Sequence, residues 1–206
     1  MSFFSFSRRR LVLKAVGIGL ALIALLVLPG CWVSSISPLY EESSIDHLVP
    51  EDHDVAFDQT LMGSWSVTDD KCTTLLTIAS KNKVYDLQST EQGEGCSGDK
   101  SHRQATLVKL DAYYFLDVSP IAEDVCDMCL AKHDIFLVKF DKTTLSLTPI
   151  DSDWLKKSID AKTVTLATLA GDTDTITASS TELKAFCRKF AENTEVFRYA
   201  MMFKRK

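Results

Sequence analysis

Motifs of the common catalytic sites are missing from this sequence. No G-x-S-x-G nucleophile elbow occurs, and the glycine-containing stretch 93–98 lies between predicted strands rather than before a helix that could bind a phosphate. Histidine, the most frequent general base, is scarce, and the chain has only His47, His53, His102 and His133. We therefore expect a non-enzymatic protein that carries no cofactor.

Positive charge is scarce as well. The 206 residues include 23 basic and 28 acidic side chains, which gives a net charge of −5. Removal of residues 1–30 would leave 19 basic against the same 28 acidic side chains, a net charge of about −9. Such a surface repels phosphate backbones, so we expect no nucleic-acid partner. The same charge keeps copies of the chain apart and favours a monomer.

The N-terminus carries a basic start and then an apolar run. Arg8–Arg10 precede Ala15–Leu28, in which no side chain is charged or able to form a hydrogen bond. A bilayer span needs roughly 20 apolar residues, so this shorter run is typical of a secretory signal peptide. The leucine-rich run favours the general secretory route, and Arg9-Arg10 leaves twin-arginine export as the alternative.

The next residues, Leu28-Pro29-Gly30-Cys31, resemble the bacterial lipobox. The resemblance implies cleavage of residues 1–30 and attachment of acyl chains such as palmitate to Cys31, which anchors the protein in the cell envelope. Pro29 stands where a small residue is usual, which leaves an uncleaved anchor as the alternative. Trp32 resembles the residue that follows Cys in lipoproteins of the outer membrane, so we expect a location on that membrane facing the periplasm.

Residues 32–54 have the composition of a tether. Serine, proline and acidic residues are frequent there, and neither Lys nor Arg occurs. Such segments bury too little apolar surface to offset the entropy of ordering. We therefore expect a signal peptide at 1–30, lipidated Cys31 with a flexible tether to residue 54 that spans roughly 30 Å, and a folded domain at 55–206.

The expected domain is mainly β. Apolar residues alternate with polar ones in several segments, and His133–Phe140 and Thr143–Ile150 form the clearest hairpin, with Asp141-Lys142 as its turn. No predicted strand is a continuous apolar run, which favours an antiparallel sheet with one solvated face. We expect a barrel or sandwich whose inward positions are uncharged: Tyr85, Leu87, Tyr114, Leu116, Val118, Phe136, Val138, Phe140, Leu145, Leu147 and, near the end, Phe197, Tyr199, Met201 and Phe203.

Two helices interrupt the strand pattern. Ser152 can cap a short helix that contains Trp154, and Ser179 with Glu182 has the spacing of a capping box before an amphipathic helix at 181–193. Cys187 lies on the apolar stripe of that helix and reads as a small buried hydrophobe. The final residues, 204–206, are basic and are expected to be a solvated tail.

Leu61-x-Gly63-x-Trp65 at the first predicted strand, followed by hairpins and a late helix, resembles a lipocalin-type barrel. In that superfamily the tryptophan packs across the closed end of the barrel. More of the chain is similar to a set of uncharacterised bacterial lipoproteins, through Pro38-Leu39-Tyr40, Phe57-Asp58, Asp153-Trp154-Leu155 and Thr177–Leu183. These resemblances imply a lipocalin-like fold and an envelope location, but no activity.

The remaining cysteines allow two further hypotheses. Cys72 and Cys96 lie at the edges of turns, where a disulfide would stabilise the domain by about 3 kcal/mol. Cys126-x-x-Cys129, with His133 nearby, has the spacing of a redox pair, half a metal site or a tight structural disulfide. Structural thiols are the favoured interpretation, because no thioredoxin-like βαβ pattern surrounds the motif. The leading hypothesis is a lipid-anchored protein that binds an apolar ligand in its barrel or, if aromatic side chains fill the barrel completely, an envelope partner on its surface. The alternative is a thiol-redox or metal-binding factor that uses Cys126 and Cys129.

Overall fold

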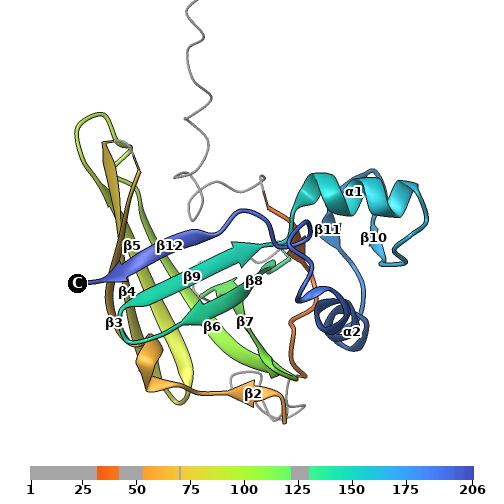
Figure 1. The fold of residues 1–206 in the computed structure, drawn as a ribbon, viewed down its shortest axis with the longest axis horizontal. Helices are drawn as coiled ribbons and strands as arrows, with labels where there is room; N and C mark the ends of the chain where they lie inside the picture. The colour runs from red at the N-terminus through yellow and green to blue at the C-terminus, as the bar shows by residue number, and fades with distance from the viewer. Residues whose placement is uncertain (1–31, 42–52, 70, 122–129) are drawn as a thin grey trace, which may run out of the picture.

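The computed structural model describes residues 32–41, 53–69, 71–121 and 130–206. Eight antiparallel strands close into a barrel, because each strand pairs with the next and the last pairs with the first (Figure 1). This confirms the expectation of a mainly β, antiparallel fold with two helices. The barrel strands are β3 (Gly63–Asp69), β4 (Cys72–Lys81), β5 (Val84–Gln92), β6 (Lys100–Leu110), β7 (Tyr113–Pro120), β8 (His133–Phe140), β9 (Thr144–Pro149) and β12 (Met201–Arg205).

The up-and-down strand order gives the barrel two distinct ends. The 3-10 helix η2 (Gln59–Leu61) and the turns β4–β5, β6–β7 and β8–β9 lie at one end, which we call the Trp65 end. The connections β3–β4, β5–β6 and β7–β8 lie at the other end, which we call the Trp32 end. A short strand, β2 (Val55–Ala56), pairs with β6 and leads the chain to η2.

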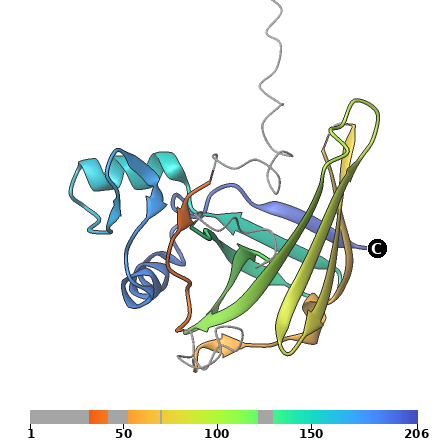
Figure 2. The ribbon, with the colours of Figure 1, turned by 180° about the vertical axis from the view of Figure 1, so that it is seen from behind.

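An insertion between β9 and β12 packs on the outside of the barrel. It consists of α1 (Ser152–Asp160), β10 (Thr168–Leu169), β11 (Asp172–Ile176) and α2 (Ser180–Phe190). Strand β1 (Ser34–Ser35) lies between this insertion and the barrel, antiparallel to β8 and parallel to β11 (Figures 1 and 2). The N-terminal segment therefore joins the two parts of the fold.

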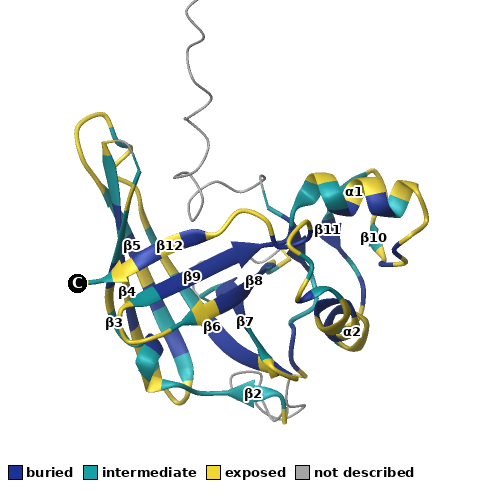
Figure 3. Cartoon of the chain, viewed as in Figure 1, coloured by how far each residue is buried: buried dark blue, intermediate teal, exposed yellow. Residues whose placement is uncertain are grey.

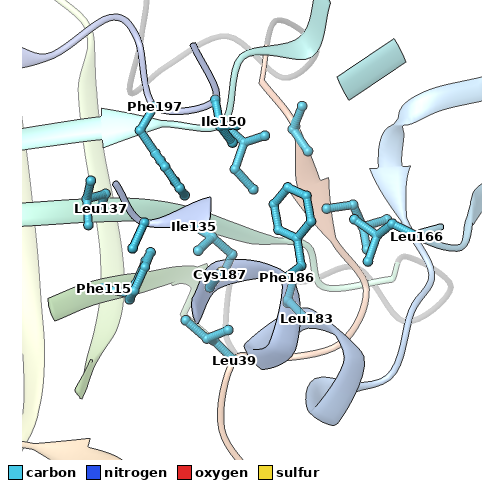
Figure 4. Packing of buried hydrophobic residues seen from close by; sticks show 14 of the residues in the cluster. Leu39, Phe115, Ile135, Leu137, Ile150, Leu166, Leu183, Phe186, Cys187 and Phe197 are labelled. Atoms are coloured by element: carbon cyan, nitrogen blue, oxygen red, sulfur yellow. The ribbon is translucent and has the colours of Figure 1, made fainter. Parts of the chain in front are cut away.

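The wall formed by β6–β9 is buried on both faces, so the expectation of one solvated face is wrong here (Figure 3). One apolar cluster fills the barrel, and a second lies between the wall and the insertion. Figure 4 shows this second cluster, in which Phe115 and Ile135 of the wall point toward α2. Phe197 belongs to it and Tyr199 is 52% exposed, so of the last expected inward residues only Met201 and Phe203 lie in the barrel cluster.

Residues 32–41 are part of the fold, so the expectation of a flexible tether is wrong for this segment. Val33 and Leu39 are 2% and 0% exposed and pack in the outer cluster. The carboxylate of Asp54 forms ion pairs of 3.0 Å with both Lys184 and Arg188 on α2. Packing against residues far along the chain orders a segment that has no apolar period of its own. The remainder of the expected tether, 42–52, lies outside the described residues.

Each helix begins directly after a residue whose side chain accepts a hydrogen bond from a backbone N–H of the first turn. Asp151, not the expected Ser152, caps α1, because its carboxylate accepts a hydrogen bond from the Trp154 N–H at 2.7 Å. Ser179 and Glu182 form the expected capping box of α2, and the helix ends at Phe190, three residues before the predicted end.

The packing of the N-terminal segment yields a stability prediction. We expect Leu39→Ala to lower the free energy of unfolding by about 3 kcal/mol, since it removes a fully buried side chain and leaves a cavity. Leu130→Ala is the control, because Leu130 is 74% exposed and its truncation should change little. Urea denaturation of both variants measures the effect, and equal midpoints would mean that the segment acts as a tether.

Candidate functional site

The Trp65 end of the barrel is closed by a tryptophan and an arginine. The Trp65 indole N–H donates to the Leu61 carbonyl at 2.9 Å, and the Arg205 guanidinium lies over the Trp65 ring, 4.1 Å from its centre. Arg205 also donates to the backbone carbonyls of Lys142 at 2.7 Å, Met62 at 2.8 Å and Thr60. The expectation that Arg205 belongs to a solvated tail is therefore wrong, because β12 carries it into this cluster.

Gly63 makes this arrangement possible. Its φ of +125° lies in a region that glycine adopts without strain, and a Cβ there would come within 2.6 Å of Arg205 Nη1. The close approach explains why glycine precedes the buried tryptophan by two residues.

This cluster yields a second stability prediction. We expect Arg205→Ala to destabilise the protein by about 3 kcal/mol, because it uncovers the Trp65 ring and leaves three carbonyls without their charged donor. Lys204→Ala is the matched control on the same strand, since Lys204 is exposed. Thermal unfolding with Trp fluorescence distinguishes them, and equal transition temperatures would contradict this account of barrel closure.

The interior of the barrel is apolar, and the hydroxyl of its buried tyrosine, Tyr85, is fully partnered. Tyr85 Oη donates to the Asp58 carbonyl at 3.1 Å and accepts from the Asp58 N–H at 2.7 Å. Burial raises the pKa of Tyr85 to about 12, so the hydroxyl stays neutral. The interior cluster contains Leu61, Trp65, Leu76, Ile78, Tyr85, Leu87, Ala105, Leu107, Leu116, Val118, Phe136, Val138, Leu145, Leu147, Met201 and Phe203.

Two charged residues continue the inward faces at the Trp32 end, which the sequence analysis missed. Arg103 pairs with Leu87 and precedes the interior residue Ala105 by two positions, so alternation turns it inward. Asp134 pairs with Val118 and precedes Phe136 in the same way. The expectation that the inward faces are uncharged is wrong at this end. On β6 and β8 the inward face continues past the last alternating apolar residue to one more position, which Arg103 and Asp134 occupy.

The pKa of Asp134 reflects its partly buried position. Burial raises its pKa to about 6, and the positive charge of Arg103 offsets part of that rise. Beside these two residues, the Ser89 and Ser101 hydroxyls share a hydrogen bond of 2.7 Å on the same inward face. The barrel interior is therefore apolar in its middle and polar at its Trp32 end.

Trp32 adds an unsatisfied donor to this polar end. Its ring meets that of the interior residue Phe136 edge to face, with 6.1 Å between the ring centres. Within the described residues, Trp32 Nε1 is the buried side-chain polar atom that lacks a hydrogen-bond partner. Buried indole N–H groups usually find an acceptor, so the atom marks a place where an acceptor oxygen would fit.

A second polar group lies on the outer face of the same wall. The Asp117 carboxylate, 1% exposed, accepts a hydrogen bond from the Leu39 N–H at 2.6 Å and lies 2.7 Å from His133 Nδ1. His133 is buried as well. Asp117 ties the N-terminal segment to β7 and β8. No local signal in the sequence distinguishes such a buried aspartate from one on a solvated strand face.

The cysteines lie in different environments. Cys72 and Cys96 form a disulfide that joins β4 to the β5–β6 loop at the Trp32 end. Cys187 is buried as a free thiol in the outer cluster, and burial raises its pKa. Cys31, Cys126 and Cys129 lie outside the described residues, and within the described ones no group of three His, Cys, Asp or Glu side chains is placed to hold a metal ion.

The position of Asp134 predicts a pH dependence of stability. The native state holds the Asp134 proton up to about pH 6, whereas the unfolded chain releases it near the ordinary value of 3.8. The contribution of Asp134 to the free energy of unfolding therefore falls by about 2–3 kcal/mol as the pH rises between these two values.

Asp134→Asn cannot ionise, so we expect it to stabilise the protein at pH 7 and to match the wild type at pH 4. Asp160→Asn, whose side chain is 62% exposed, is the control. Urea denaturation across this range measures the difference, and a constant gap between Asp134→Asn and wild type would contradict the burial of Asp134.

In the part of the chain that the structure describes, neither helix has the length and apolarity that crossing a bilayer requires. Comparison with protein families, curated proteins and solved structures finds no match to the chain.

Proposed function

We propose that the chain is a lipid-anchored, non-enzymatic protein of the bacterial cell envelope that binds an apolar ligand at the Trp32 end of its barrel. The N-terminal pattern Leu28-Pro29-Gly30-Cys31 supports the anchor. The apolar interior supports the nature of the ligand. The acidic mature chain argues against a nucleic-acid partner and for a monomer, and Trp32 directly after Cys31 supports the outer membrane as its location.

The place of Trp32 is the observation that carries this proposal. Trp32 follows the expected lipidated residue directly, and its ring meets Phe136 inside the barrel. Strand β1 begins at Ser34, so Cys31 lies at most about 11 Å from it along an extended chain. The anchor would thus hold the Trp32 end against the membrane, and the domain would not hang from a tether of roughly 30 Å.

Exposed apolar side chains at the same end fit contact with a bilayer. Leu130 precedes β8 by three residues and is 74% exposed, and Tyr199 precedes β12 by two residues. The Arg198 guanidinium lies 5.1 Å from the centre of the Tyr199 ring. Aromatic and basic residues of this kind settle at membrane interfaces, with the charge in water and the ring in the headgroup region. An apolar ligand could then pass between bilayer and barrel with little exposure to water.

The three tryptophans provide a test of this arrangement. The full chain is purified from membranes, its intact mass is measured, and it is placed in vesicles that contain brominated phosphatidylcholine, which quenches nearby indoles. We expect a mass that lacks residues 1–30 and includes acyl chains, with strong quenching of Trp32 and none of Trp65 at the far end.

Trp32→Phe should therefore abolish most of the quenching, and Trp154→Phe, on α1, is the matched control. A mass that retains residues 1–30 without acyl chains would refute the lipid anchor. Quenching that Trp32→Phe leaves unchanged would refute the orientation.

A further inference from the structure

We infer that the Trp65 end of the barrel is an interaction surface for a carboxylate-rich polymer, the peptidoglycan of the cell wall. This inference rests on the proposed function, because it needs the envelope location and the anchor beside the Trp32 end. It adds a second partner at the opposite end of the barrel from the proposed ligand.

Exposed lysines gather at the Trp65 end. They come from the β4–β5 turn, the end of β8, the β8–β9 turn and the end of β12, and we call them the lysine patch: Lys81, Lys83, Lys139, Lys142, Lys204 and Lys206. None of these lysines forms an ion pair with a described residue. The chain as a whole has a net charge of −5, so the patch is opposite in sign to the protein that carries it.

The contacts of Arg205 bring the parts of the lysine patch together. Its guanidinium donates to the carbonyls of Lys142 at 2.7 Å and Met62 at 2.8 Å. The Met62 sulfur accepts from the hydroxyl of Ser80 at 3.5 Å, directly before Lys81. In Figure 1 the C-terminus accordingly lies beside β3 and β4. The lysines therefore share one region of the surface, although they come from segments far apart in the sequence.

The carboxylates at this end have partners other than the lysine patch. Asp141 accepts hydrogen bonds from backbone N–H groups and hydroxyls within its own turn. The carboxylate of Asp58 caps η2. Asp111, in the β6–β7 turn, lies 4.0 Å from Arg188 of α2. The six lysines therefore outnumber the acids around them and make this end positive.

The chemistry of the lysine patch favours a hydrated polyanion over the surface of a folded protein. A lysine ammonium is a strongly hydrated point charge on a flexible stem, whereas protein interfaces are depleted of lysine and enriched in aromatic residues and arginine. The arginine at this end, Arg205, is already used by three carbonyls and the Trp65 ring. Carboxylates spaced along a polymer can meet several lysines at once, which strengthens binding without a shaped pocket.

The proposed anchor places the lysine patch away from the membrane. Strand β6, with 11 residues, is about 35 Å long, and the tilt of barrel strands leaves the Trp65 end roughly 25–30 Å from the Trp32 end. Charges are screened over about 8 Å at physiological salt, so headgroups beside the anchor do not act on the patch. In the envelope, the peptide carboxylates of peptidoglycan supply the matching charge beyond the membrane. The same polymer repels the acidic remainder of the chain, which turns the Trp65 end toward it.

Cosedimentation with purified, protein-free peptidoglycan tests the inference on the full chain in a non-ionic detergent. We expect the wild type to sediment with the polymer at about 50 mM NaCl and to be released at about 500 mM, because salt screens exposed charges. Lys81→Glu/Lys142→Glu should bind at least tenfold more weakly. Conversion of the peptidoglycan carboxylates to amides should weaken binding of the wild type to the same extent.

Matched variants make the result specific. Lys71→Glu/Lys100→Glu is the control, because both lysines are exposed at the Trp32 end and the net charge changes equally. This control should retain the wild-type binding. Lys83→Glu/Lys206→Glu, a second pair from the lysine patch, should show the same loss as the first. Cooperative thermal transitions equal to that of the wild type verify the fold of each variant.

Each other outcome overturns a defined statement. Equal binding of the patch variants and the control refutes the lysine patch as the binding surface. Binding that survives amidation refutes the carboxylate. Displacement by phosphatidylglycerol micelles at a lower anion concentration than by poly-L-glutamate assigns the patch to a membrane surface and refutes the polymer.

The outcome is separable from that of the proposed function. Intact mass and quenching of Trp32 do not depend on the lysine patch, so failure of the polymer to bind leaves the anchor and its orientation intact. Sedimentation in detergent does not need the anchor. An unacylated mass would therefore refute the orientation on which the inference rests, even where the polymer binds.

Discussion

The guanidinium of Arg205 holds the two ends of the barrel sheet together. Strand β12 must pair with β9 on one side and β3 on the other, although residues 70–200 separate it from β3. Arg205 fixes that register, because it covers the Trp65 ring and donates to carbonyls from the residues before β3 and from the β8–β9 turn. Closure removes the exposed sheet edges that a row of eight strands would otherwise present. The apolar interior depends on this closure, and Gly63 leaves the space for it.

Closure also gives the barrel an outer wall on which the rest of the chain packs. The insertion between β9 and β12 covers the outer face of β6–β9, and β1 completes the cover by pairing with β8 and β11. Asp117 satisfies the Leu39 N–H beneath this cover, where water cannot. Loss of the N-terminal segment would therefore uncover apolar surface and leave a buried carboxylate without its donor, which is why we regard residues 32–41 as part of the domain.

Sequence patterns over a few neighbouring residues correctly predicted the strand faces and the helix start that those residues alone determine. Alternation placed Leu116, Val118 and Phe136 on one face, and the spacing of Ser179 and Glu182 located the start of α2. Arg205 was missed because its partners lie about 140 residues away, so that it looks like part of a charged tail. Asp117 and Arg103 were missed because alternation shows which residues share a face but not whether that face is solvated. For Arg205 and Asp117, the deciding contact comes from a distant segment of the chain.

A tryptophan and an arginine lie at each end of the barrel, and their different environments separate stability from function. At the Trp65 end, the indole N–H has an acceptor and the guanidinium has three carbonyls and a ring, so folding alone accounts for both residues. At the Trp32 end, the Trp32 indole N–H is buried without an acceptor among the described residues, and the positive charge of Arg103 acts on Asp134. A buried donor without an acceptor costs stability, so the Trp32 N–H does not itself stabilise the fold, although the Trp32 ring packs against Phe136. The proposed anchor, one residue before Trp32, would place this N–H beside the membrane, where a ligand of the proposed function would supply the acceptor.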